Sequence, residues 1–282
     1  MYIYFALLYA LFKGFNDIFK KKSRLNSHTS AVLAMMTTIS FALCLIWIPF
    51  GIEIPYKFVP ILAIKGFMLA INWHIVIRIL KDANLSLVTT FNLLSVAITF
   101  TLGITMFGES VSVLQIVGIV MVLSGIMLMS MLNKKGGVKW THFIFLTIGA
   151  IITAASSAID KYTTQQLTNY QVQFWFYFYA CLSSWLIYLV DCIRQKDSLL
   201  KKTDLKNIWI YLVGLFLFLG DTMLFFAYKM PNSQMIIITV LSKLKVLITV
   251  GAGILLFKEK NIAKKIMLTI IIILGTILIA VF

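Results

Sequence analysis

The sequence predicts an all-α membrane protein whose ten transmembrane helices form two inverted five-helix repeats. Three observations lead to this prediction: an apolar composition, apolar blocks of regular length, and basic residues at alternate junctions. Of the 282 residues, 61% are hydrophobic and only 12% are charged, whereas a soluble domain is about half apolar and about a quarter charged. The mean hydropathy is +0.96, so a soluble globular class is excluded.

The apolar residues fall into blocks of roughly 20 residues, the length that a helix needs to cross a bilayer. Ten such blocks can be marked: 2–19, 31–50, 58–79, 85–107, 112–131, 140–160, 170–191, 208–228, 234–257 and 263–281. None shows the strict alternation of a β-barrel strand, so we expect helices. The first block lacks a basic stretch before it and a small-residue cleavage site after it, so we expect helix 1 rather than a cleaved signal peptide.

The basic residues account for the net charge of +15 without a nucleic-acid partner. Of the 25 Lys and Arg, 18 lie at the junctions that follow helices 1, 3, 5, 7 and 9, and the other junctions hold only Lys57, Lys161 and Lys229. This alternation predicts that the basic junctions are cytoplasmic and that both termini lie outside. We therefore expect a multi-pass protein of the inner or plasma membrane whose basic face lies against anionic lipid headgroups.

Catalytic and metal-binding signatures are absent from the sequence. The cysteines Cys44, Cys181 and Cys192 have irregular spacing, so neither a metal site nor a disulfide framework is expected. There is no HExxH, no phosphate-binding loop and no GxSxG motif. We expect no enzymatic activity and no cofactor.

The charged residues inside the apolar blocks are the candidate functional groups. A charge near the centre of a membrane helix costs roughly 2.5–3.5 kcal/mol on insertion scales, so such residues usually have a specific role. Lys243 and Lys245 lie near the middle of helix 9 and, in a regular helix, point about 200° apart. We expect one to face a central cavity and the other a neighbouring helix, unless the helix is distorted. The remaining charges of this kind are Lys13, Asp17, Lys65 and Asp221, with Asp160 near a helix end.

Two segments of the chain indicate an internal duplication. Residues 107–128 resemble residues 257–278, with Glu109 and Gly125 in the first matched by Glu259 and Gly275 in the second. The chain therefore divides into a first repeat, 1–133, and a second, 134–282. Because each half has five helices, the halves are inverted relative to one another, which places a substrate site between them near the midplane and predicts alternating access.

The same motifs carry a family resemblance. The polar turn RILKDANLS before helix 4, then GES and the glycines Gly118 and Gly125, are repeated in the second half as FAYKMPNSQ, KEK and helix 10. This pattern resembles the drug/metabolite transporter superfamily, in its ten-helix EamA-like branch. The resemblance implies a central cavity lined by helices 1, 3, 4, 6, 8 and 9. Many members have a proline in the middle of helices 4 and 9, whereas this chain has none there.

The expected substrate site follows from these charges and from the resemblance. In the phosphate-handling branch of the superfamily, basic residues on helix 9 clamp the phosphate. We expect substrate binding by Lys243, Lys245, Lys65, Asn72, Asn92 and Ser95. Asp221 is the expected partner of one helix 9 lysine, and Lys13 with Asp17 is expected to form a pair at i,i+4 spacing; these three residues would serve coupling or charge pairing. The aromatic run 174–180 is expected to face lipid or the membrane interface.

The predicted function is secondary transport of a small anionic or zwitterionic metabolite by exchange or proton coupling. The expected partners are this small molecule and the lipid bilayer, and the chain is expected to be a monomer. One alternative is a multidrug or amino-acid exporter whose lysines are held in structural ion pairs. Another is a lipid-linked carrier or a flippase subunit.

Overall fold

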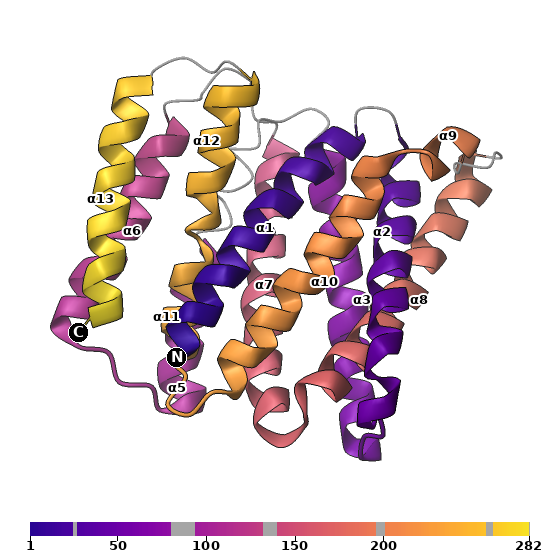
Figure 1. The fold of residues 1–282 in the computed structure, drawn as a ribbon, viewed down its shortest axis with the longest axis horizontal. Helices are drawn as coiled ribbons and strands as arrows, with labels where there is room; N and C mark the ends of the chain where they lie inside the picture. Colours follow the sequence, from indigo (N-terminus) through magenta and orange to yellow (C-terminus); the bar gives the residue numbers. More distant parts are fainter. Residues whose placement is uncertain (25–26, 80–93, 132–139, 196–200, 258–261, 282) are drawn as a thin grey trace.

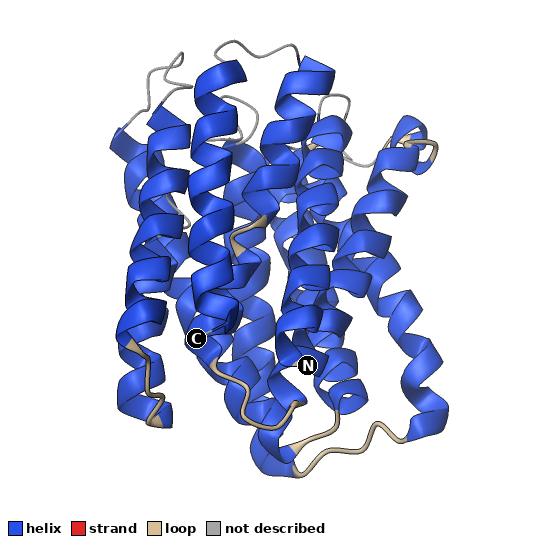
Figure 2. Cartoon of the chain, turned by 60° about the vertical axis from the view of Figure 1, so that its left-hand side comes forward, coloured by secondary structure: helices blue, strands red, loops and turns tan. Residues whose placement is uncertain are grey.

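The computed structural model describes the whole chain except residues 25–26, 80–93, 132–139, 196–200, 258–261 and 282. In the described residues the regular elements are all helices (Figures 1 and 2), which confirms the all-α prediction. The elements of the first half are α1 Tyr2–Arg24, α2 Thr29–Cys44, η1 Leu45–Phe50, η2 Tyr56–Phe58, α3 Val59–Ile79, α5 Leu94–Phe107 and α6 Val113–Met131. Those of the second half are α7 Trp140–Gln166, α8 Asn169–Gln195, α9 Lys202–Leu205, α10 Ile208–Lys229, α11 Met235–Ser242, α12 Lys245–Phe257 and α13 Ile262–Val281.

Helix length and composition support a multi-pass membrane protein. By these criteria five helical segments of the described chain can cross a membrane: Thr29–Phe50, Tyr56–Ile79, Ile144–Gln166, Asn169–Gln195 and Ile208–Lys229. Shorter apolar helices lie at Ile98–Phe107, Val113–Gly125 and Ile270–Ile279. The number of ten spans stays a prediction. Both termini lie at one end of the bundle, and the basic C-terminal turn of α1 and the short helix α9 lie at the other (Figure 1).

The segment expected as helix 9 is two helices rather than one. The helix α11 ends at Ser242, and α12 begins at Lys245. Between them the backbone tightens: Lys243 N donates to Val240 O at 3.0 Å and Leu244 N to Leu241 O at 3.0 Å, a three-residue spacing instead of four. A short 3₁₀ stretch of this kind often marks a hinge. The chain thus breaks this helix at its lysines, in a segment that contains no proline.

The aromatic run 174–180 on α8 is mostly buried. Phe174, Phe176, Tyr177 and Ala180 are buried, whereas Phe178 is exposed. The expectation that this run faces lipid is therefore wrong for most of its members. The physical reason is the helical period, because Phe174, Tyr177 and Ala180 follow one another at three-residue spacing and share the face of α8 that packs on its neighbours.

The helices α6 and α13 form a closely packed pair at one edge of the molecule (Figure 1). A methyl group on Gly118 would lie 2.6 Å from the carbonyl oxygen of Gly275, and one on Gly275 would lie 2.8 Å from that of Gly118. The two backbones can approach this closely only because both residues lack a side chain. A similar role belongs to Gly125, where a methyl group would lie 2.7 Å from Ile272 Cγ1.

We predict that Gly118→Ala lowers the thermal unfolding midpoint of the purified protein, because the added methyl group forces α6 and α13 apart. Gly251→Ala in α12 is the matched control, since a methyl group added there would have no neighbouring atom within 4 Å, and alanine is intrinsically better in a helix by about 1 kcal/mol. A midpoint for Gly118→Ala equal to or above that of Gly251→Ala would contradict the packing argument.

Candidate functional site

A cavity of about 140 Å³ lies among α1, α3, α7, α8, α10 and α12. Its walls combine aromatic side chains, small hydroxyl side chains and an unusual number of charges. The lysines that line it are Lys13, Lys20, Lys65 and Lys245. The aspartates that line it are Asp17, Asp160 and Asp221. Of the helices expected around the cavity, helices 1, 3, 6, 8 and 9 line it as α1, α3, α7, α10 and α12. Helix 4 contributes no described residue to it, and α8, the seventh expected helix, contributes Phe176.

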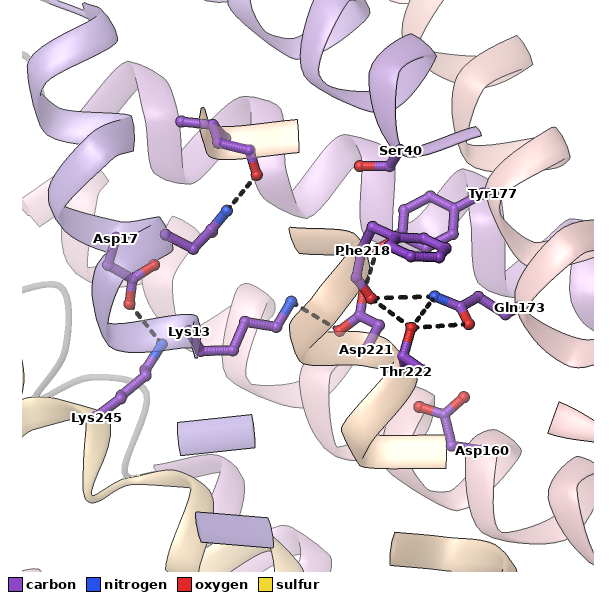
Figure 3. Close-up of polar contacts among 12 residues, drawn as sticks. Lys13, Asp17, Ser40, Asp160, Gln173, Tyr177, Phe218, Asp221, Thr222 and Lys245 are labelled. Carbon is purple, nitrogen blue, oxygen red and sulfur yellow. Dashed lines mark hydrogen bonds and ion pairs between the residues drawn. The ribbon is translucent and has the colours of Figure 1, made fainter. Parts of the chain in front are cut away.

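The first ion pair joins α1 to α10. Lys13 Nζ lies 2.8 Å from Asp221 Oδ1, and Tyr177 donates its hydroxyl hydrogen to Asp221 Oδ2 at 2.5 Å. Figure 3 shows Lys13 extended toward Asp221 across the space between the two helices. The expectation that Asp221 pairs with a helix 9 lysine is therefore wrong. The helices α1 and α10 pack along one another, so the partner of Asp221 comes from α1 and not from helix 9.

The second ion pair joins α3 to α7. Lys65 Nζ contacts Asp160 Oδ1, and the same ammonium lies 3.9 Å from the ring centroid of Phe176 and 4.8 Å from that of Phe225. Because Lys65 is only 1% exposed, its charge is enclosed by a carboxylate and two aromatic faces. The sequence provided no obvious partner for Lys65, since Asp160 is 95 residues away in the chain.

The third charged group is a triad on α1 and α12. Lys245 Nζ lies 2.8 Å from Asp17 Oδ2, and Lys20 Nζ lies 3.9 Å from Asp17 Oδ1. The Lys245 ammonium points toward Asp17 in Figure 3. The expected pairing of Asp17 with Lys13 is therefore wrong: Asp17 faces α12, and Lys13 faces α10. Lys20 also lies 5.9 Å from the ring centroid of Trp73.

Sequence reasoning missed Lys20 as a site residue. Its position in the chain places it at the basic junction after helix 1, but α1 continues to Arg24, and Lys20 is buried within it. The available signal was spacing, because Asp17 and Lys20 are three residues apart and therefore share a helix face.

Lys243 lies outside the central cavity. Its Nζ donates to Ser95 Oγ on α5 at 2.9 Å, so two predicted site residues are in direct contact. Lys243 lines a smaller pocket of about 70 Å³ that shares Tyr9, Ser157 and Lys245 with the central cavity. Asn92, the other helix 4 residue that we expected, falls outside the described residues.

Asn72 on α3 lies in the wall of the central cavity. Its Nδ2 donates to Thr153 Oγ1 on α7 at 3.3 Å, while its Oδ1 is buried without a hydrogen-bond partner among the described residues. This oxygen lies against α7, because a methyl group added to Gly149 would be only 2.5 Å from it. Asn72 therefore joins α3 to α7 at the wall of the cavity.

The charges that line the cavity do not balance. The described walls carry one more lysine than aspartate, and the excess ammonium belongs to the triad, where Lys20 and Lys245 share Asp17. A buried excess charge attracts a counter-ion strongly because the surroundings screen it poorly. The arrangement can therefore bind a small solute with a negative group.

Comparison with known proteins identifies the family. The model of the EamA-like transporter family matches the chain twice, over residues 1–131 and 140–281. The chain belongs to the EamA-like transporter family. This confirms the resemblance drawn from the two sets of turn and glycine motifs.

The fold of this EamA-like chain also matches solved structures. One, described as "Crystal structure of protein", is 14% identical, has a TM-score of 0.75, and its match covers 98% of this chain and 95% of that one. A search of curated proteins finds no match. At 14% identity the structural match concerns the fold alone, and the family supplies the general function, transport across a membrane.

We predict that Lys65→Met destabilises the transporter by about 3–5 kcal/mol, the usual cost of leaving a buried charge unpaired. The double variant Lys65→Met/Asp160→Asn should recover most of this loss, because no isolated charge remains. Unfolding in mixed detergent micelles measures each free energy, and a double-mutant cycle gives the coupling. Additive losses in the double variant would contradict the pairing.

Proposed function

We propose that this EamA-like protein is a secondary transporter that moves a small anionic or zwitterionic metabolite through the central cavity by alternating access. The observation that supports this most is the triad, in which two lysines on different helices share one aspartate. A negative group on the solute relieves that imbalance. The expected drive is exchange or proton coupling.

Lys20 is the residue that we assign to the negative group of the solute. Its ammonium is 3.9 Å from Asp17, beyond the 2.7–2.9 Å typical of a charge-assisted hydrogen bond. A carboxylate or phosphate oxygen can therefore accept from Lys20 without breaking a short bond. The indole of Trp73 and the amide of Asn72 line the same cavity and supply an apolar wall and polar contacts.

Lys65 and Lys13 fit a different role from the one that the sequence suggested. Each already has a carboxylate in contact, and each pair joins a helix of the first half to a helix of the second. We propose that these pairs, together with Asp17 and Lys245, hold the halves in one conformation and exchange partners during the cycle. Asp221, Asp17 and Asp160 are then the groups on which a coupled proton would reside.

The charge pattern supports an orientation with the basic junctions in the cytoplasm and both termini outside, in the inner or plasma membrane. A monomer contains both halves and therefore the complete cavity.

One observation favours a second candidate, an amino-acid or multidrug exporter. All four cavity lysines lie within ion-pair distance of an aspartate, and Tyr9, Trp73, Phe176 and Phe225 also line the cavity. If the charges act only as structural pairs, this aromatic wall is the binding surface, and a lipophilic cation becomes a suitable solute.

We predict that Lys20→Gln weakens binding of an anionic solute about tenfold or more, since a hydrogen bond to a charged group contributes about 1.5–3 kcal/mol. Purified protein is screened by thermal shift against organic phosphates, carboxylates, amino acids and lipophilic cations, because a ligand of the folded state raises the midpoint. Lys22→Gln is the matched control: Lys22 lies 4.1 Å from the ring centroid of Trp209, outside the cavity.

The outcomes separate the two candidates. An anion that stabilises wild type and Lys22→Gln but not Lys20→Gln supports the anionic solute. Stabilisation by lipophilic cations alone, unchanged in Lys20→Gln, supports the exporter and contradicts our proposal.

A further inference from the structure

A second hollow lies at the end of the molecule that holds both termini. It is formed by the last turns of α7 and α10 and the loop before α11, and has a volume of about 370 Å³. The residues that matter here are Lys161 and Gln165 on α7, Tyr228 and Lys229 on α10, and Asn232 and Ser233 in the loop. Figure 1 shows this loop at the same end as the N-terminus and the C-terminus.

Both lysines of this hollow contact neutral oxygens. Lys161 is only 5% exposed; its ammonium donates to the carbonyl oxygen of Ser233 and, at 2.9 Å, to Ser233 Oγ. Lys229 Nζ donates to Leu167 O at 3.1 Å. No carboxylate lines the described walls. The nearby Glu109 accepts from Met235 N and Ile236 N and is close enough to Lys161 to attract its charge, but it does not line the hollow. The two ammonium groups that do line it create a positive potential that concentrates anions.

The sequence has few basic residues at this end of the molecule. Only Lys57, Lys161 and Lys229 lie at the junctions of this end, and two of the three converge on one hollow. Basic residues are less frequent on the outer side of a membrane protein. Under the orientation that we propose, the positive-inside rule therefore does not account for Lys161 and Lys229.

The hollow also lies next to the transport cavity. Tyr228 lines the hollow and lines the smaller pocket that contains Lys243. That pocket in turn shares Tyr9, Ser157 and Lys245 with the central cavity. Tyr228 is buried, at 2% exposure, and the hollow and the smaller pocket adjoin at this residue.

We propose that this hollow is a second anion-binding site, which holds a carboxylate or phosphate group at the terminal end of the transport path, where the hollow adjoins the smaller pocket at Tyr228. Its place on the path rests on the proposed function, whereas anion binding by Lys161 and Lys229 does not. A soluble anion and an anionic lipid headgroup share this chemistry, and the experiment separates them.

The test measures the local potential with a cysteine in place of Gln165, which is exposed in the wall of the hollow. Cys181 and Cys192, which are partly exposed, are first replaced by serine. The rates of labelling by a negatively charged sulfonatoethyl methanethiosulfonate and its positively charged trimethylammonium analogue are compared in detergent. Lys161→Gln and Lys229→Gln should each lower the ratio of these rates by roughly 3–10-fold.

Lys57→Gln is the matched control, because Lys57 lies at the same end but over the ring of Phe58 and outside the hollow. It should leave the ratio unchanged. Millimolar phosphate or succinate should slow the labelling more than sodium chloride at equal ionic strength, since general screening acts equally in both. Lys229 is exposed, so Lys229→Gln keeps the test valid if the buried Lys161 proves necessary for folding.

Two results would overturn the site: an unchanged rate ratio in folded Lys229→Gln, or protection by phosphate and succinate no greater than by chloride. Protection by phosphatidylglycerol in nanodiscs, without protection by soluble anions, would assign the hollow to a lipid headgroup and remove it from the transport path. Lys20→Gln should not change the labelling, so a failure of the central anion site and a failure of this site give different patterns.

Discussion

A charge inside a bilayer is costly unless a polar or oppositely charged group contacts it, and in this protein three buried lysines find an aspartate on a helix of the other half. Lys13 with Asp221, Lys65 with Asp160, and Lys245 with Asp17 each join a residue before position 134 to one after it. Because these side chains reach only a few ångströms, they fix how α1, α3, α7, α10 and α12 rotate and how deep they lie. The cavity is the space left where those pairs meet.

The helices and the family could be predicted because they depend on local properties. Block length and composition determine which segments are helical, and the repeated turn and glycine motifs lie within short stretches. The presence of functional charges was also readable, because a lysine or aspartate in an apolar block stands out from its neighbours in the sequence.

The partners of those charges could not be predicted, because they depend on the relative rotation of helices that are far apart in the chain. Asp17 is four residues from Lys13, a spacing that allows a pair within one helix, yet each side chain has a partner on another helix. Lys20 was missed for a related reason: a basic residue four positions before the end of α1 satisfies the positive-inside pattern equally well whether it faces headgroups or a cavity. The break at Lys243 and Leu244 was not signalled by a proline, and only the backbone hydrogen bonds reveal it.

The contact between α6 and α13 has a symmetry that follows from the duplication. Gly125 and Gly275 are equivalent positions in the two repeats, and the same alignment makes Leu268 the counterpart of Gly118. The contact of Gly275 with the Gly118 carbonyl is therefore matched by the approach of Gly125 to the Leu268 carbonyl, where a methyl group would lie 3.5 Å away. A two-fold axis that exchanges the halves thus passes through this antiparallel helix pair. Under the alternating access that we propose, the halves exchange roles. A contact on this axis maps onto itself, so α6 and α13 can keep their contact throughout that exchange.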